Sequence, residues 1–453
     1  MVLGILAAAV AVLLLTGSFA RTSNQLKVAD APLGPAVLSW PSINPSAVST
    51  SWYCPLAPAS EAGGAERVIV INPSRFREQF QIGSLVGKTM RRYRIAPYSS
   101  IGFSTPTSGG VSVLSKGSVV AEVASLGGSD LAPCTSSPAV SWLAGGLGTR
   151  LGEVATVQVY NPFSEQAIVD VAGLTTTGTV SVPKGQGIII PSGGTVALKA
   201  DTIVPGEDGA ALSISAKAGR VVVSELVGRS SAGSPTYEPA VAAPSVRSNF
   251  LYIPTAGLSS LRIDLANPTA ATEQVSLGVR GYRQGSPHEA VLQRSRFSLR
   301  VVVPAGSTVG VDLTAQATQG SALAVSVTLD SSQGVYAWAS IERRSGGVTA
   351  YSSELPQVLR SRNWVIQCNS PDTALLPLGF SSGLRGGPVN VQQVTRSHLP
   401  RAQVTTTSLV APGVISVPSQ PSGLSFYHIS APAQVFVTPA GVSSCLSLPV
   451  AGD

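Results

Sequence analysis

Histidine, cysteine and charged residues are scarce in this sequence. Its 453 residues include three histidines and four cysteines, and Asp, Glu, Lys and Arg together make up 12%. Zinc sites need clustered Cys or His ligands, whereas the four cysteines lie far apart and form no C-x-x-C pair. We therefore expect no metal site and no cofactor.

Residue constellations that would carry enzyme chemistry are also missing. Neither His288 nor His428 has a nucleophile motif beside it, which leaves a Ser-His-acid triad without support. The densest acidic stretch, Glu207 and Asp208, belongs to PGEDG, a composition typical of a turn. The sequence therefore predicts a protein that is not an enzyme.

Good helix formers are few, while glycine and proline are abundant. The chain has 46 Gly, 33 Pro and only 2 Met, and Val, Thr and Ser recur throughout. This composition favours many short strands joined by turns. Because 453 residues are many for one hydrophobic core, we expect an all-β protein with several domains.

The N-terminal segment predicts the cellular compartment. Residues 2–20 (VLGILAAAVAVLLLTGSFA) carry no charge, and about twenty apolar residues span a bilayer as a helix. Residues 18–20 also offer a small-x-small cleavage site, as in a secretory signal. We expect export, and we favour a retained membrane anchor over a cleaved signal. Residues 21–49, rich in proline, would form a spacer.

The four cysteines are expected to form disulfides, because isolated cysteines in an oxidising compartment usually pair. Three pairings are possible for four cysteines. Cys54 and Cys134 are 80 residues apart, and Cys368 and Cys445 are 77 apart. These two near-equal separations favour one disulfide at each end of the chain.

Three segments share one pattern, an alternating apolar run that ends in Asn-Pro. They are RVIVINPS (67–74), TVQVYNPF (156–163) and RIDLANPT (262–269). Alternation predicts a strand with one buried face, and Asn-Pro ends it because proline has no N–H for the ladder. Turns of the Pro-x-Gly type follow in two of them, at residues 183–185 and 304–306.

Each segment also has an aromatic strand before it and a Val-rich closing strand after it. The unit recurs at intervals typical of an immunoglobulin-like β-sandwich. We predict four tandem units, at residues 50–136, 137–240, 247–347 and 357–453, of which the fourth lacks Asn-Pro and diverges. Tryptophans on lead or closing strands are expected to be buried, namely Trp52, Trp142, Trp338 and Trp364.

The motif SWYCP at residues 51–55 follows the hydrophobic segment and precedes an Asn-Pro strand. In this it resembles an uncharacterised family of exported actinobacterial proteins, a domain of unknown function. The resemblance implies a location in the envelope of a high-GC Gram-positive bacterium. It implies no activity and no catalytic residues.

Two basic clusters stand out in a chain of net charge +7. They are candidate anion-binding residues: Arg91, Arg92 and Arg94 in the first, and Arg294, Arg296 and Arg300 in the second. Alternate residues of a strand share a face, and arginine suits phosphate or carboxylate groups. Protection of an exposed strand edge by charge is the favoured alternative.

Two functions remain open. The chain could be an extracytoplasmic scaffold or docking surface for an envelope protein or an anionic cell-wall polymer, or it could bind a cell-wall glycan. Glycan sites usually stack sugars on exposed aromatics, and aromatics make up only 6% of this sequence. We therefore favour the scaffold. Export argues against nucleic acid as a partner.

Overall fold

The computed structural model describes much of the chain from residue 49 to residue 449. It leaves out the segments 57–65, 75, 87–88, 98, 105–108, 126–130, 230–235, 240–247, 256, 285–289, 319–323, 332–333, 346–347, 355–360, 369–373, 381–387, 395–406, 411–412, 418–424 and 438–444. From residue 345 onward it describes the backbone alone. The predicted anchor and spacer lie outside the described residues. No helix within the described part is long and apolar enough to cross a membrane.

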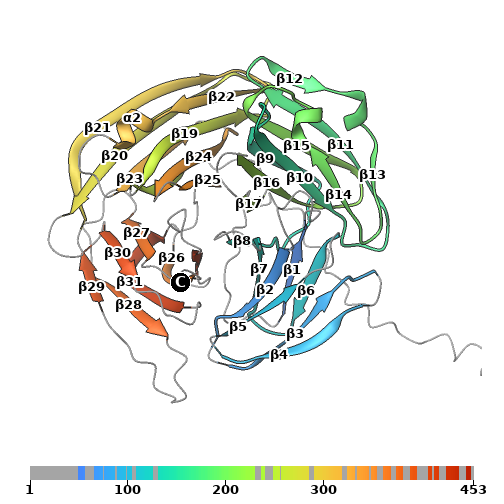
Figure 1. The fold of residues 1–453 in the computed structure, drawn as a ribbon, viewed down its shortest axis with the longest axis horizontal. Helices are drawn as coiled ribbons and strands as arrows, with labels where there is room; N and C mark the ends of the chain where they lie inside the picture. Colours follow the sequence, from blue (N-terminus) through green and yellow to red (C-terminus); the bar gives the residue numbers. More distant parts are fainter. Residues whose placement is uncertain are drawn as a thin grey trace, which may run out of the picture. The chain divides into compact units, whose positions relative to one another are not determined.

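The described chain is almost entirely β-structure, which confirms the predicted all-β class (Figure 1). Its first eight strands, which we call repeat 1, form two four-stranded sheets. Their bounds are β1 Thr50–Cys54, β2 Glu66–Asn72, β3 Glu78–Gly83, β4 Arg91–Ile95, β5 Ser99–Ser104, β6 Val111–Ser115, β7 Val120–Ser125 and β8 Leu131–Pro133. Sheet I has the order β1-β6-β3-β4 and sheet II the order β5-β2-β7-β8.

Repeat 2 follows the same plan. Its strands are β9 Ser141–Gly148, β10 Glu153–Tyr160, β11 Ala167–Thr175, β12 Gly178–Ser181, β13 Ile188–Ile190, β14 Thr195–Lys199, β15 Asp208–Ala218, β16 Val222–Arg229 and β17 Thr236–Pro239. Short 3-10 helices occupy η1 Pro183–Gly185 and η2 Ala200–Thr202. Sheet I runs β9-β15-β11, with β12 and β13 both beside β11, and sheet II runs β14-β10-β16-β17.

Repeat 3 has the same order again. Its elements are β18 Ser248–Pro254, β19 Leu258–Asn267, β20 Glu273–Gln284, β21 Ala290–Val303, β22 Ser307–Asp312, α2 Thr314–Thr318, β23 Ala324–Ser331, β24 Tyr336–Ser345 and β25 Val348–Glu354. Sheet I runs β18-β23-β20-β21 and sheet II runs β22-β19-β24-β25. One parallel pair, Thr175 beside Ser307, joins sheet II of repeat 3 to sheet I of repeat 2.

The strand order of each repeat differs from that of an immunoglobulin constant domain. There the first strand pairs with the second and the seventh with the sixth. Here the first strand pairs with the sixth, as β1 does with β6, and the seventh pairs with the second, as β7 does with β2. Relative to that domain, the first and seventh strands are exchanged between the two sheets, and the fourth strand lies beside the third instead of the fifth.

Each repeat has its own hydrophobic core, to which both sheets contribute. In repeat 1, Phe80 and Val113 of sheet I pack with Val68 and Val123 of sheet II. Corresponding aliphatic clusters fill repeats 2 and 3. The alternating apolar residues of the sequence supply these clusters, because every second side chain of a strand points to the same face.

The asparagine of each Asn-Pro pair does more than end its strand. All three are buried: Asn72, Asn161 and Asn267. Each side-chain N–H₂ donates to the carbonyl four residues on, at 2.6–2.7 Å, namely that of Phe76, Glu165 and Ala271. It also donates to a carbonyl at the end of the fourth strand, namely that of Ala96, Ile190 and Val303.

One part of the predicted repeat was aligned wrongly. The predicted Pro-x-Gly turn at residues 304–306 follows the fourth strand, β21, directly. Residues 183–185 instead form η1, which interrupts the fourth-strand position between β12 and β13. The two turns share a composition but occupy different places in the fold.

The remaining strands do not follow the plan of repeats 1 to 3. They are β26 Ser361–Cys368, β27 Ala374–Phe380, β28 Pro388–Val394, β29 Thr407–Val410, β30 Gly413–Val417, β31 Ser425–Val437 and β32 Cys445–Pro449. All seven belong to one sheet, in which β31 pairs with β26, β27 and β28. The side chain of Trp364 lies outside the described part.

The predicted disulfide between Cys54 and Cys134 is present, with the two Cα atoms 4.8 Å apart. It joins the end of β1 to the residue after β8, so it closes repeat 1. Cys368 and Cys445 lie directly opposite each other on β26 and β32. Directly opposed residues of antiparallel strands are close enough for a disulfide. Their side chains are outside the described part, so this bond stays a prediction.

Candidate functional site

A polar cavity of about 220 Å³ lies where repeat 2 meets repeat 3. Repeat 2 lines it from β9, β10, β15 and β16, and repeat 3 lines it from β19, β22 and β24. Five carboxylates and two arginines face it: Glu153, Asp208, Asp264, Asp312, Glu342, Arg229 and Arg262. Seven charged groups in a chain so poor in charge make this cavity the candidate site.

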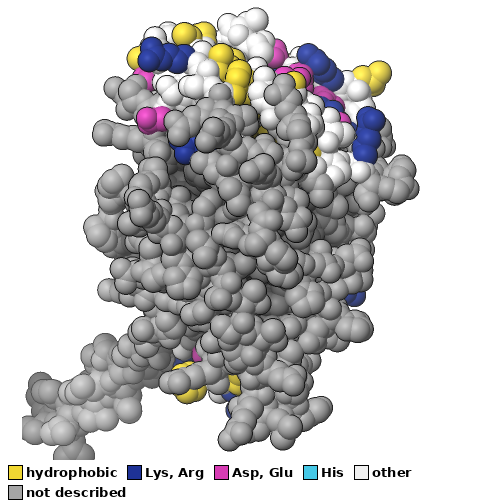
Figure 2. All heavy atoms as spheres, turned by 90° about the vertical axis from the view of Figure 1, so that its left-hand side faces the viewer, with side chains coloured by type: hydrophobic (Ala, Val, Ile, Leu, Met, Phe, Trp, Pro, Cys, Tyr) yellow, Lys and Arg dark blue, Asp and Glu magenta, His cyan; other side chains and the backbone are white. Residues whose placement is uncertain are grey.

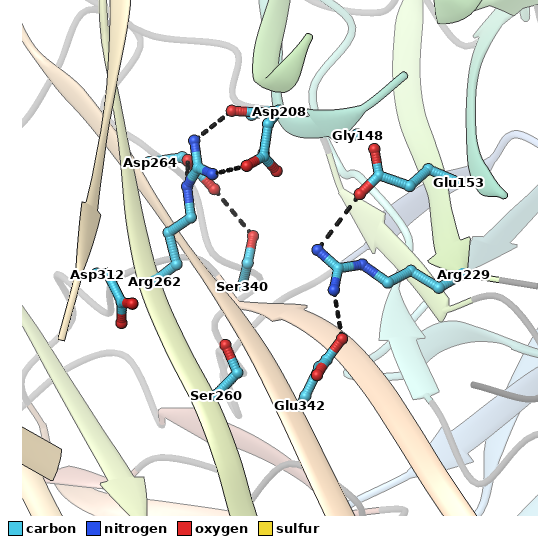
Figure 3. A pocket seen from close by; sticks show the side chains of 12 residues that line it. Gly148, Glu153, Asp208, Arg229, Ser260, Arg262, Asp264, Asp312, Ser340 and Glu342 are labelled. Atoms are coloured by element: carbon cyan, nitrogen blue, oxygen red, sulfur yellow. Dashed lines mark hydrogen bonds and ion pairs between the residues drawn. The ribbon is translucent and has the colours of Figure 1, made fainter. Parts of the chain in front are cut away.

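Arg262 organises one side of the cavity (Figure 3). Its Nε donates to Asp264 Oδ1 at 2.7 Å, and its Nη atoms reach the carboxylate and the backbone carbonyl of Asp208. Ser340 donates to the second oxygen of Asp264 at 2.9 Å. Arg262 and Asp264 belong to β19, whereas Asp208 begins β15, so this cluster joins the two repeats.

Arg229 organises the other side in a similar way. Its guanidinium lies 3.3 Å from Glu153 of repeat 2 and also pairs with Glu342 of repeat 3. The second oxygen of Glu153 accepts the backbone N–H of Arg150 at 2.9 Å. Each cavity arginine therefore bridges a carboxylate of repeat 2 and a carboxylate of repeat 3.

Glycines make room for these ion pairs. A Cβ at Gly209 would clash with the carboxylate of Asp264, and a Cβ at Gly310 would clash with the guanidinium of Arg262. Gly209 also has φ +91°, which side chains rarely adopt. The backbone can therefore approach the buried charges closely only because these positions lack side chains.

Burial and ion pairing shift the pKa values of this cluster in opposite directions. Burial raises the pKa of Asp264 from 3.8 to about 6, although Arg262 and Ser340 oppose the shift. Burial alone would lower the pKa of Arg262, but Asp264 and Asp208 raise it overall. The side chain of Asp264 is 3% exposed and that of Arg262 is 23% exposed, so desolvation outweighs pairing only at the carboxylate.

An apolar contact lies beside the cavity and joins the same two repeats. Trp338 of β24 is fully buried with Leu143 and Leu174 of repeat 2. A Cβ at Gly145 would clash with its indole ring. The buried carboxyl of Glu225 accepts the Gly145 N–H at 2.9 Å. Burial raises the pKa of Glu225, and the hydrogen bond from the Gly145 N–H opposes that shift.

Repeats 1 and 2 meet through different chemistry. Tyr160 of β10 packs with Tyr53 of β1, and its hydroxyl lies 3.0 Å from Ser112 Oγ of β6. A Cβ at Gly110 would clash with the Tyr160 ring. Burial raises the pKa of Tyr160 to about 12, Ser112 opposes the shift and Tyr53 adds to it. In both junctions sheet I of one repeat contacts sheet II of the next.

The carboxylates that line the cavity all have polar partners. Every one of its five carboxylates accepts a hydrogen bond or forms an ion pair with a described group. No histidine or cysteine lines it, and among the described residues no group of three acidic, His or Cys side chains could hold a metal ion. Four of the five carboxylates thus pair with the two arginines, whereas Asp312 accepts the Thr314 N–H within repeat 3.

The structure places the predicted anion-binding arginines away from this cavity. Arg91, Arg92 and Arg94 lie exposed on β4, and Arg300 lies exposed on β21. Arg294 and Arg296 also belong to β21, but their side chains are not described. On the face drawn in Figure 2, the described surface carries basic and acidic side chains among hydrophobic and other ones, so its charge is of mixed sign.

The sequence analysis did not predict the cavity, although the positions of some of its charged residues could have indicated it. Glu207 and Asp208 were interpreted as part of a turn, yet Asp208 is the first residue of β15 and pairs with Arg262. Arg262 and Asp264 stand two residues apart in the otherwise apolar run from Leu261 to Ala266, which alternation predicts to be half-buried. Charges at such positions need partners, and this requirement could have revealed the cluster.

Comparisons with known proteins add little about activity. A family model described as "Family of unknown function (DUF5719)" matches residues 107–243, which include all of β9 to β17. No curated protein matches the chain. A solved structure of Streptomyces avermitilis alpha-L-rhamnosidase complexed with L-rhamnose aligns at 10% identity and a TM-score of 0.13, over 92% of this chain and 57% of that chain. So low a TM-score carries no argument.

Proposed function

We propose that this chain is an exported, non-enzymatic scaffold of the cell envelope, in which stacked β-sandwich repeats hold a docking surface in a fixed arrangement. Each repeat is immunoglobulin-like in its size and in its two layered sheets, although its strand order differs from that of an immunoglobulin domain. The SWYCP motif and the resemblance it carries support an envelope location in an actinobacterium. The Cys54–Cys134 disulfide fits the oxidising conditions outside the cytoplasm.

The junction between repeats 2 and 3 is the observation that carries the proposal. Arg229 and Arg262 each pair with carboxylates of both repeats, and Trp338 packs across the same boundary. Interfaces between domains are usually small and permit motion unless they are extensive and apolar. A junction with paired buried charges and a buried tryptophan favours a fixed orientation, which a spacer or scaffold requires.

The tryptophans favour the scaffold over a glycan-binding protein. Trp52 and Trp142 are buried, and each indole N–H donates to a backbone carbonyl of the closing strand region, that of Val119 and Val221. Trp338 is also buried. These three side chains cannot stack on a sugar, so the buried tryptophans provide no aromatic platform of the kind that a glycan site usually uses.

The absence of a free acid pair in the cavity favours a protein without hydrolase activity. Glycoside hydrolysis generally uses one carboxylic acid and one carboxylate placed across the bond to be broken. The cavity carboxylates are held by Arg229, Arg262, Ser340 or neighbouring backbone N–H groups instead. Asp264, whose pKa is raised, has both oxygens engaged.

Cell fractionation combined with crosslinking tests the proposal. The tagged chain should be found with the envelope, and crosslinking should recover one stoichiometric protein or polymer partner. As a matched comparison, the chain with Arg262→Met should remain exported but lose the partner if docking needs the fixed orientation. Recovery in the cytoplasm, or saturable binding of a neutral glycan that is abolished by changing one exposed aromatic residue, would overturn the scaffold.

A further inference from the structure

Repeat 1 has an exposed basic surface on its sheet I. Among the described strands, β4 forms the edge of this sheet and pairs with β3. Tyr93 packs against Phe80 and Phe103 toward the core, with ring centroids 5.7 and 4.8 Å apart respectively. Because side chains alternate along a strand, Arg92 and Arg94 lie on the opposite, outer face, and both are exposed.

Two glutamines complete this outer face. Gln81 lies directly opposite Arg92 and Gln79 directly opposite Arg94 in the antiparallel register. Residues two apart on a strand are about 7 Å apart, and neighbouring strands are about 4.8 Å apart. The outer face therefore presents two guanidinium groups in a row beside two amides. No acidic or aromatic residue occupies any of these four positions.

These two arginines contrast with the three arginines that form ion pairs in the described part of the chain. Arg150, Arg229 and Arg262 all form ion pairs with carboxylates. Arg92 and Arg94 form no ion pair with any described residue. Unpaired exposed arginines retain their full capacity to bind an anion, and their planar guanidinium groups suit phosphate oxygens.

The other repeats show that the fold does not require arginines here. The buried asparagines mark equivalent places, because Asn161 and Asn267 bond Ile190 and Val303 just as Asn72 approaches Ile95. One residue before those carbonyls stand Arg94, Ile189 and Val302, and three residues before them stand Arg92, Gly187 and Arg300. Only repeat 1 has an arginine at both positions.

We propose that the outer face of β3 and β4 binds a linear polyol-phosphate polymer through Arg92 and Arg94. The inference deepens the scaffold function and rests on it for the presence of such a polymer. Each arginine would bind one phosphodiester, and the row spacing is comparable to that of successive phosphates joined by a short polyol. Gln79 and Gln81 can donate to and accept from the hydroxyl groups between them.

Single-stranded nucleic acid fits this surface less well. Proteins that bind it stack bases on aromatic side chains, whereas the four positions of the surface are two arginines and two glutamines. Protection of the β4 edge from aggregation needs charge but no particular ligand. In the measurement described next, each alternative predicts a result different from the one that the proposal predicts.

The test uses the full 453-residue chain and a fluorescently labelled glycerol-phosphate oligomer, with binding followed by polarisation at two salt concentrations. Saturable binding is expected, weakened at least about tenfold by Arg92→Gln with Arg94→Gln, which corresponds to the loss of one strong charge-assisted contact or more. The matched control Arg300→Gln removes an exposed arginine at the equivalent place in repeat 3 and should leave binding unchanged. Circular dichroism checks that all variants remain folded.

Three results would overturn the proposal: no binding by the unmodified chain, equal losses in the double variant and in Arg300→Gln, or tighter binding of single-stranded DNA. Equal losses would indicate a response to total charge alone. None of these results bears on envelope location or on the partner recovered by crosslinking. Failure here is therefore distinguishable from failure of the scaffold function.

Discussion

The two junctions between consecutive repeats use the same sheets but opposite chemistry. Between repeats 1 and 2, Tyr160 packs on Tyr53 and shares one hydrogen bond with Ser112. Between repeats 2 and 3, Arg229 and Arg262 each bridge carboxylates of both repeats. The fold thus decides which faces meet, and a few side chains decide whether the contact responds to pH.

The charged junction, between repeats 2 and 3, carries a free-energy cost that the other junction lacks. Taking charges out of water is unfavourable unless each has a partner, and Asp264 shows this cost in its raised pKa. The junction between repeats 1 and 2, which we call the hydroxyl junction, has no buried ion pair among its described contacts. We therefore expect the two junctions to separate under different conditions, and the following predictions test that difference.

The largest effect is expected for Arg262→Met. The substitution leaves Asp264 and Asp208 without their shared cation, and breaking a buried ion pair costs about 3–5 kcal/mol. Hydrogen exchange should show this loss of stability at β19 and β15. The control is Arg150→Met, which also removes a partner of Asp208, but an exposed one. A cost for Arg150→Met as large as that for Arg262→Met would show that burial of the pair is unimportant.

The pH dependence of the charged junction should be the next largest effect. The pKa of Asp264 is higher in the folded chain, so its stabilising contribution is complete below pH 3.8 and is lost as pH rises through about 6. That shift corresponds to about 3 kcal/mol. Hydrogen exchange in β19 between pH 4.5 and 7.5 should show this loss of stability, and Asp264→Asn should reduce the dependence of stability on pH. Equal slopes in β19 of the two proteins would rule out Asp264 as the source.

A smaller effect is expected for Gly209→Ala. Its Cβ would clash with Asp264, and its φ of +91° is unfavourable for alanine. The cost of the backbone conformation alone is about 1–2 kcal/mol. Gly206→Ala is the matched control, because Gly206 has φ +79° but open space around its Cβ position. Thermal unfolding should show a larger loss for Gly209→Ala, and equal losses would mean that the cluster relaxes freely.

The smallest effect is expected at the hydroxyl junction. Tyr160→Phe removes the hydrogen bond to Ser112 and should destabilise this contact by about 1 kcal/mol. Adding Ser112→Ala should restore part of the loss, because no buried hydroxyl is then left unpartnered. Hydrogen exchange in β10 and β6 measures both variants. The effect should not change between pH 5 and pH 8, whereas a pH-dependent effect would contradict the comparison.

Much of the local structure could be predicted from residue patterns. Alternating apolar residues predicted the strands, Asn-Pro predicted where β2, β10 and β19 end, and cysteine spacing predicted the bond between Cys54 and Cys134. These features depend on neighbours in the chain or on one pair of residues. The additional hydrogen bonds of Asn72 and its counterparts were not predicted, because they reach carbonyls 24 to 36 residues away.

The cavity could not be predicted because its residues come together only when the repeats stack. Asp208 and Arg262 are 54 residues apart, and Arg229 and Glu342 are 113 apart. Neither separation nor composition marks them as partners. The order of strands within each sheet was equally out of reach, since pairing of the first strand with the second or the sixth buries the same alternating residues.

The distance between repeats 2 and 3 in solution tests the central claim, that the charged junction holds them in one orientation. Spin labels at Leu151→Cys and Val302→Cys would occupy exposed positions, one in each repeat. Pulsed dipolar spectroscopy should give one narrow distance distribution for the otherwise unmodified chain and a broad one after Arg262→Met. A broad distribution in the chain that retains Arg262 would contradict the rigid scaffold.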